Sequence, residues 1–264
     1  GFFKHAADFH NVELVKSALV YEEGNFNIDF DDFKKKAADP KVKLCLFCSP
    51  HNPTGRIWTD DELKQVARIC FENDVVIISD EIHCDLLRKG KQFTPMAKLF
   101  PTSGQIITCM ATSKTFNLAG IKMATTIIPN ADIMAQWKTK TFANENPLSI
   151  AAAQAAWQHG GEWLAQLKDY LDANFKYLDN YLKNHLPQAN FSIPDATYLA
   201  WIDVGTYFTE EENLTLFFAN KAGVLLEGGN MFVDNADGYI RLNLACPKSE
   251  LKEGLDRIAK AINI

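Results

Sequence analysis

The stretch VVIISDEIH, residues 75–83, decides the fold. Its first half is a continuous run of Val and Ile, which is typical of a strand buried on both faces of a parallel sheet. Its second half places two carboxylates and a histidine where such a strand ends. In α/β proteins, ligands bind beyond the carboxyl ends of parallel strands. The stretch therefore predicts either a strand that simply reaches water or the mouth of an active site.

Short apolar runs alternate with helical patterns through the first half of the chain. Strands are predicted at 12–20, 42–48, 75–79, 105–110 and 123–128. Helices are predicted near 29–38 and after Thr59-Asp60-Asp61-Glu62, which has the capping-box spacing. This alternation predicts an α/β fold with a mainly parallel sheet between two layers of helices, a three-layer α/β/α domain.

The second half of the chain has a different character. A long helical region is predicted over 148–185. It is followed by predicted strands at 198–203 and 238–244 and by predicted helices near 212–221 and 248–262. This order favours a smaller α+β domain joined to the first by a long helix. We expect the large domain over 1–155, and the linking helix with the small domain over 156–264.

Composition excludes several classes of partner. The chain has 264 residues, of which 47% are hydrophobic and 23% charged, with a net charge of −6. Nucleic-acid binding requires a concentrated basic face, and the longest basic run is Lys34-Lys35-Lys36. No apolar run approaches the roughly 20 residues that cross a bilayer. With no signal-peptide pattern visible, we expect a cytoplasmic location without membrane or nucleic-acid partners.

The six cysteines lie mostly within apolar runs, as free buried thiols do. The pair Cys45-x-x-Cys48 invites a redox or zinc interpretation. However, it falls in a predicted strand, where an offset of three residues points the two sulfurs to opposite faces. A second CxxC, needed to complete a zinc site, does not occur. We therefore expect free thiols and no metal site.

Three predicted strand ends carry residues that could perform chemistry. They are Asn52-Pro53-Thr54-Gly55, Ser79-Asp80-Glu81-Ile82-His83 and Thr112-Ser113-Lys114. Taken singly, each has a structural explanation, because Pro/Asn/Gly turns are common and a lysine just past a strand is usually solvated. Their order and spacing together favour a functional site.

Taken jointly, these segments resemble the fold-type I pyridoxal phosphate (PLP) enzymes of the class I/II aminotransferase superfamily. The resemblance covers almost the whole chain. It rests on Asn-Pro-Thr-Gly at 52–55, Asp80, Ser113-Lys114 and Arg241 within Tyr-Ile-Arg-Leu-Asn, in the family's order. It implies the PLP-dependent transferase-like fold, PLP as cofactor, an amino-acid substrate and a homodimer.

The resemblance also implies a role for each landmark. Lys114 would form the Schiff base with the PLP aldehyde and act as general base. Asp80 would pair with the pyridine nitrogen and keep it protonated. Asn52 would donate to the ring's phenolic oxygen and lie beside the substrate. Arg241 would bind the substrate α-carboxylate through a bidentate, charge-assisted pair.

Two departures from the wider superfamily stand out. Many aminotransferases have Tyr three residues after the aspartate, where this chain has His83. Many have a phosphate-binding Arg eight residues after the lysine, where Lys122 stands here. We expect His83 in the cofactor shell, and Lys122, Ser113 and Thr112 at the phosphate. The alternative for Lys122 is an exposed turn lysine after Gly120.

These departures indicate a branch. The segments DEIHCDL at 80–86, SKTFNLAG at 113–120, NPLS at 146–149 and RLNLACP at 241–247 look like the cystathionine β-lyase, or C–S lyase, branch. Members eliminate a thiol from cystathionine-like amino acids and release pyruvate and ammonia. The same residues support an aminotransferase that uses a 2-oxo acid, which stays an alternative. A non-catalytic or regulatory fragment is the alternative from another class.

The first residues, Gly1-Phe2-Phe3-Lys4, include no initiator Met. Chains that this one resembles run much further towards the N-terminus, where a Gly-containing loop seats the PLP phosphate and an aromatic stacks on the ring. We therefore expect a chain that lacks this N-terminal segment. On that hypothesis the chain alone binds PLP weakly and turns over little.

Overall fold

The computed structural model describes residues 2–22, 24–141, 145–208, 213–232 and 236–263. They form two compact units. The sheet unit comprises Phe30–Asn52 and Arg56–Lys168, and the C-terminal unit comprises Gly1–Asp29, Pro53–Gly55 and Asp169–Ile264. Helix α8 (Gly161–His185) runs from one unit into the other. The domain boundary expected between residues 155 and 156 stays a prediction.

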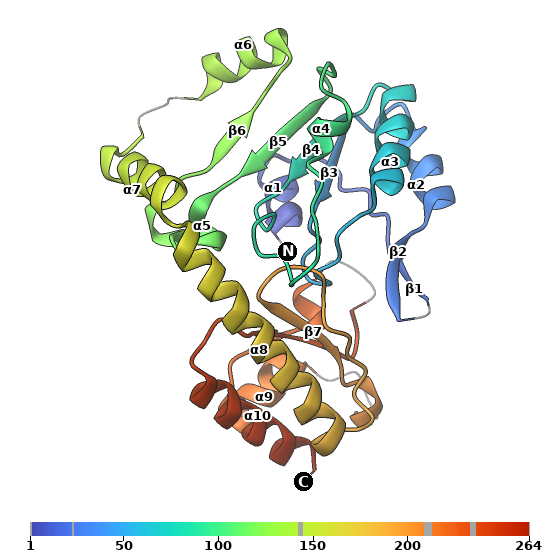
Figure 1. The fold of residues 1–264 in the computed structure, drawn as a ribbon. Helices are drawn as coiled ribbons and strands as arrows, with labels where there is room; N and C mark the ends of the chain where they lie inside the picture. The colour runs from blue at the N-terminus through green and yellow to red at the C-terminus, as the bar shows by residue number, and fades with distance from the viewer. Residues whose placement is uncertain (1, 23, 142–144, 209–212, 233–235, 264) are drawn as a thin grey trace. The chain divides into compact units, whose positions relative to one another are not determined.

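The sheet unit is built on four strands in the order β3 (Leu44–Cys48), β4 (Val76–Asp80), β5 (Ile106–Met110) and β6 (Thr125–Ile127) (Figure 1). The first three are parallel, and β6 pairs antiparallel with β5. The predicted mixed α/β fold with a mainly parallel sheet is confirmed. Ile77 of β4 is fully buried.

The register of this sheet gathers the strand ends at one edge. Cys48 of β3 lies opposite Asp80, which in turn lies opposite Cys109 of β5. Backbone hydrogen bonds continue just beyond the strands, from Ser49 N to Asp80 O at 2.9 Å and from Glu81 N to Cys109 O at 2.8 Å. Residues that follow β3, β4 and β5 are therefore held side by side, where α/β proteins place their ligands.

Helices of the sheet unit follow local signals in the sequence. They are α2 (Phe30–Ala37), α3 (Asp60–Glu72), α4 (Met96–Leu99), α5 (Thr112–Thr115), α6 (Ala131–Lys140) and α7 (Pro147–His159), with the 3₁₀ turn η1 at Ala119–Ile121. The predicted capping box opens α3, because Glu62 N donates to Thr59 Oγ1 at 3.2 Å and Thr59 N donates to Glu62 Oε2 at 2.8 Å. Such a cap contributes about 1 kcal/mol to stability.

The C-terminal unit has an antiparallel sheet in the order β7 (Leu199–Asp203), β9 (Tyr239–Asn243) and β8 (Glu227–Gly228). Its core joins this sheet to α8, α9 (Leu214–Ala222) and α10 (Lys248–Ile262). Along α8 the spacing of three and four residues buries Leu171, Phe175, Leu178 and Leu182 on one face.

The same unit contains α1 (Phe2–Phe9), the hairpin of β1 (Leu19–Glu22) and β2 (Asn25–Ile28), and the 3₁₀ turns η2 (Gly205–Tyr207) and η3 (Gly229–Met231). Within the described residues, no helix combines the length and apolar character that a bilayer crossing requires.

One local prediction is wrong. The strand expected over 12–20 is irregular until Leu19, where the short strand β1 begins, and the side chains of Val12 and Val15 are exposed. The helical region expected over 148–185 is confirmed, although Gly160 divides it into α7 and α8. A Cβ at Gly160 would lie 2.3 Å from a ring carbon of Phe116, so this position has no room for a side chain.

Candidate active site

Asp80 is the last residue of β4 and is half-buried. Its Oδ1 accepts a hydrogen bond from Ile82 N at 3.3 Å. Burial raises the pKa of Asp80, while the Ile82 N–H and the positive charge of Lys114 act in the opposite direction. Because desolvation is the largest of these influences, the ionised carboxylate is under-stabilised and suited to a further cationic partner.

The neighbours of Asp80 have different roles. Glu81 is 2% exposed, and its Oε1 accepts from Ser79 Oγ at 2.9 Å and from Met96 N at 3.1 Å. Glu81 therefore belongs to the scaffold. His83 is also 2% exposed and lies in the turn that follows β4. The carboxylate of Glu81 thus accepts hydrogen bonds from Ser79 and Met96, whereas that of Asp80 accepts the bond from Ile82 N.

Lys114 lies in the single turn of α5, directly after β5. It is half-buried between Thr112, which is 1% exposed, and Thr115, which is fully buried. The Thr115 Oγ1 donates to Asp85 Oδ2 at 3.0 Å, which ties α5 to the segment that follows β4. The structure thus anchors the lysine's turn and places its charge where it acts on Asp80.

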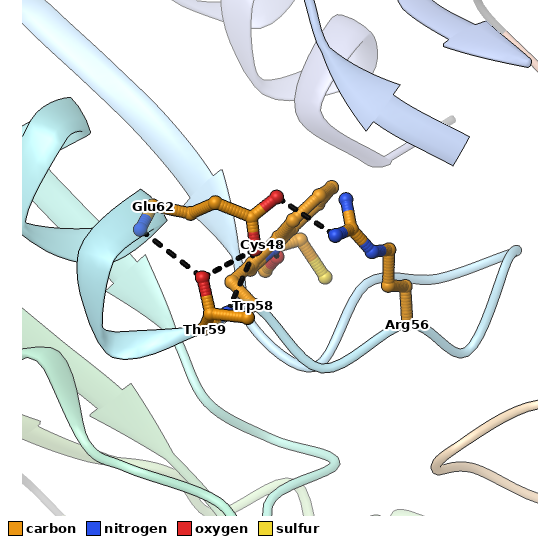
Figure 2. Close-up of polar contacts among 5 residues, drawn as sticks. All are labelled: Cys48, Arg56, Trp58, Thr59 and Glu62. Carbon is orange, nitrogen blue, oxygen red and sulfur yellow. Dashed lines mark hydrogen bonds and ion pairs between the residues drawn. The ribbon is translucent and has the colours of Figure 1, made fainter. Parts of the chain in front are cut away.

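Asn52 lies in the segment between β3 and α3, whose anchors are drawn in Figure 2. Trp58 Nε1 donates to the carbonyl of Cys48 at 2.9 Å, at the end of β3. Arg56 Nη2 pairs with Glu62 Oε1 of α3 at 2.7 Å, and its guanidinium lies 4.7 Å from the centre of the Trp58 ring. These contacts hold both ends of the segment against the sheet unit.

The polar groups beside Asn52 are held in their neutral forms. Burial lowers the pKa of His51 to about 4, and the charge of Arg56 adds to this effect. Burial also raises the pKa of the Cys48 thiol to about 12, with a further contribution from Asp80. The Cys48 Sγ donates to the carbonyl of Pro50 at 3.2 Å. Neither group is therefore an ionised nucleophile or a charged acid near pH 7.

The remaining predicted phosphate residues lie on and after α5. Ser113 is half-buried, whereas Lys122 is exposed and follows η1 in a left-handed conformation with φ of 49°. Lys122 thus lies where the alternative expected it, as an exposed lysine in a turn. A contact of Lys122 or Ser113 with phosphate stays a prediction.

Arg241 belongs to the C-terminal unit, at the centre of β9. It lies between Trp201 of β7 and Glu227 of β8 in the strand register. Its Nη2 forms an ion pair with Glu227 Oε2, and its guanidinium lies 5.1 Å from the centre of the Phe232 ring. Burial lowers the pKa of Arg241, while Glu227 and Tyr198 raise it.

The sequence did not indicate two partners of these residues. Asp85 holds the turn of Lys114 through Thr115. Glu227 pairs with Arg241. Both pairings depend on which strands and turns become neighbours, so no local spacing in the sequence could have revealed them.

The cysteines carry free thiols throughout. In the part of the chain that the structure describes, no group of three or more His, Cys, Asp and Glu side chains is arranged to hold a metal ion. The interpretation of Cys45 and Cys48 as residues of one strand is confirmed.

Comparison with known proteins places this geometry in a family. The model of the family described as aminotransferase class I and II matches residues 1–258. Cystathionine beta-lyase PatB of Bacillus subtilis is 35% identical over 99% of this chain and 69% of its own length. A PLP-bound C-S lyase of Staphylococcus hominis, solved with the inhibitor L-cycloserine, is 46% identical, with a TM-score of 0.95 over 98% of this chain and 65% of its own.

Cystalysin of Treponema denticola, solved with pyridoxal 5'-phosphate, is 31% identical with a TM-score of 0.94. It matches 99% of this chain and 68% of its own. The chain thus spans about two thirds of the length of these relatives. The family resemblance seen in the sequence is confirmed, and the chain belongs to the aminotransferase class I and II family, in its C–S lyase branch.

Proposed function

We propose that this chain carries the active-site lysine of a PLP-dependent C–S β-lyase. The reaction converts a cystathionine-like amino acid and water into a thiol, pyruvate and ammonia. The observation that carries the proposal is that the half-buried carboxylate of Asp80, at the end of β4, lies within the electrostatic influence of Lys114, which follows the neighbouring strand β5. Membership of the C–S lyase branch supports the lyase over the aminotransferase alternative.

The donor set fits PLP. Among the described residues, the buried hydroxyl of Thr112 has no hydrogen-bond partner, and neither does that of Ser49. A buried hydroxyl without a partner costs about 1–3 kcal/mol, which a ligand with acceptor oxygens would offset. The phosphate of PLP would supply such oxygens, and Thr112 precedes Lys114 in the same turn. The residues that would hold PLP are Asn52, Asp80, His83, Thr112, Ser113, Lys114 and Lys122.

When bound, PLP acts as an electron sink for negative charge at the substrate Cα. Lys114 Nζ would hold the cofactor covalently and later take the proton from Cα. Asp80, ionised, would keep the proton on the pyridine nitrogen, and that cation would in turn offset the desolvation of the carboxylate. Arg241 would orient the substrate through its α-carboxylate.

The two enzymatic alternatives differ in what they need and release. Elimination expels a thiolate from Cβ and requires no second substrate. Transamination requires a 2-oxo acid acceptor. As part of the same proposal, the substrate is a free amino acid rather than a macromolecule, and the protein acts as a cytoplasmic homodimer, which rests on the resemblance to the family.

The deciding experiment supplies cystathionine to the purified, PLP-loaded protein without any 2-oxo acid. We expect pyruvate and free thiol to appear in equal amounts, measured by lactate dehydrogenase coupling and by a thiol-reactive dye. The protein is instead an aminotransferase if pyruvate and thiol stay at background and turnover requires an added 2-oxo acid. No turnover under either condition would favour the non-catalytic alternative.

The contact between Thr115 and Asp85 gives a prediction about cofactor retention. Thr115→Val removes the hydrogen bond to a carboxylate, which is worth about 1.5–3 kcal/mol. If part of this energy positions α5, the dissociation constant for PLP rises by about tenfold, measured by fluorescence titration. Thr115→Ser keeps the hydroxyl and should retain PLP like the parent.

The matched control is Thr139→Val, which removes a hydroxyl bonded to the Gln136 carbonyl on the exposed side of α6. It should leave PLP binding unchanged. Equal PLP affinities in the Val and Ser variants at position 115 would show that the hydrogen bond to Asp85 does not position Lys114.

A further inference from the structure

The ion pair between Arg241 and Glu227 engages the guanidinium assigned to the substrate carboxylate. The two residues lie directly opposite each other on β9 and β8, so the register of the sheet holds them together. Their burial is unequal, because the side chain of Arg241 is 16% exposed and that of Glu227 is 39% exposed. Arg241 is therefore the fixed member of the pair, and Glu227 is the member that water can reach.

The surroundings of Arg241 restrict how an anion can approach it. The guanidinium carbon lies over the Phe232 ring, 5.1 Å from the ring centre. Phe232 in turn packs against Trp201, with ring centres 4.8 Å apart. Carboxylates bind the guanidinium in its plane, through its N–H groups. Glu227 Oε2 pairs with Nη2, so a substrate carboxylate that uses Nη2 for a bidentate pair shares it with Glu227 or displaces Glu227.

We propose that Glu227 is an internal competitor for the substrate carboxylate and thereby sets the enzyme's affinity for amino acids. Glu227 holds the guanidinium in place until a carboxylate arrives, and then turns towards water. An exposed ion pair is worth about 0.2–1 kcal/mol, so the competition weakens carboxylate binding without preventing it. The proposal rests on the proposed function, which assigns Arg241 to the substrate carboxylate.

The test measures carboxylate binding without catalysis. Propionate, which has neither an amino group nor a leaving group, is titrated into the PLP-loaded protein, and its binding is measured by isothermal titration calorimetry. Glu227→Gln keeps the size of the side chain and removes its charge. We expect it to bind propionate about two- to fivefold more tightly, the range that the strength of an exposed ion pair allows. With an amino-acid substrate, KM should fall by the same factor while kcat stays unchanged.

A second variant protects the test against a loss of folding. Glu227→Asp keeps the charge but shortens its reach to Arg241, and it should bind propionate with an affinity between those of the parent and the Gln variant. Glu253→Gln is the matched control, because Glu253 pairs with Arg257 on α10 of the same unit. It removes one charge without touching Arg241 and should leave the propionate affinity unchanged.

The outcomes separate this proposal from the function on which it rests. If Arg241→Lys leaves propionate binding unchanged, the assignment of Arg241 to a carboxylate fails, and the competition proposal fails with it. If Arg241→Lys weakens binding but Glu227→Gln matches the parent or binds more weakly, only the competition proposal is overturned. In that case Glu227 orients the guanidinium rather than competing for it.

Discussion

Lys114→Ala is expected to abolish pyruvate release from cystathionine. The variant loses both the covalent anchor for PLP and the base that takes the Cα proton. A positioned general base alone contributes about 10²–10⁴-fold to rate, so we expect kcat to fall by about 10³-fold or more. The change also removes the positive charge that lowers the pKa of Asp80. Single-turnover and steady-state assays on the PLP-loaded variant measure the loss.

Two further variants show whether the effect belongs to the amine of Lys114. Lys114→Arg keeps a positive charge near Asp80 but cannot act as the amine, so it should be about as inactive as the Ala variant. Lys98→Ala removes an exposed lysine from α4 of the same unit and should retain full activity. Substantial activity in Lys114→Ala would contradict the role of Lys114. A biological effect that survives without catalysis would favour the regulatory alternative.

The elements of the sheet unit were predictable because their signals are local. The apolar run before Asp80 could only be a buried strand, and the capping box fixed the start of α3 to the residue. The strand expected over 12–20 failed because alternating apolar residues form a strand only where a neighbouring strand pairs with them. In the described residues, β1 pairs with β2 and not with residues 12–18.

The interruption at Gly160 illustrates a different limit. Glycine within a helical pattern weakens the helix by about 1 kcal/mol, which does not by itself predict a break. The approach of Phe116, which leaves no space for a Cβ at this position, explains why the residue between α7 and α8 is glycine. Phe116 lies 44 residues earlier in the chain, so its approach depends on the tertiary packing of α5 and α7. A contact of this kind has no periodic signal.

The candidate site shows the same division. Its landmarks could be named from the sequence because each follows a recognisable strand or turn at a fixed interval. The pairings that hold them could not, since Thr115 with Asp85 and Arg241 with Glu227 depend on the neighbours that the fold creates. The sequence therefore predicts which groups carry the chemistry, but it does not reveal the side chains that contact them or their turns, such as Asp85 and Glu227.

Asp80→Asn is expected to separate stability from activity. Burial raises the pKa of Asp80 above its value in the unfolded chain, so the folded state binds a proton more tightly than the unfolded state. Between these two pKa values, the free energy of unfolding of the cofactor-free protein falls as pH rises. Above both values, the cost of burying the ionised Asp80 carboxylate is fully present. Asparagine cannot ionise, so the variant lacks this penalty and should be more stable than the parent at pH 7.

The same change should impair the enzyme severely. Asparagine cannot keep a proton on the pyridine nitrogen, so the PLP-loaded variant loses the electrostatic support of the electron sink. Removal of a preorganised electrostatic partner typically costs about 10²–10³-fold in kcat, and we expect a loss in that range. Chemical denaturation of the cofactor-free protein across pH, together with kcat of the loaded protein, measures both effects. The control Asp61→Asn changes a carboxylate that is 95% exposed on α3 and should alter neither.

A variant that is both less stable and less active would show that Asp80 supports the fold through contacts of its carboxylate. A variant that is more stable and fully active would remove Asp80 from the mechanism. The expected combination, higher stability without PLP and lower kcat with it, identifies a buried charge retained for a cationic partner. The desolvation that weakens the cofactor-free fold is then the same property that makes Asp80 a strong partner for the pyridine nitrogen.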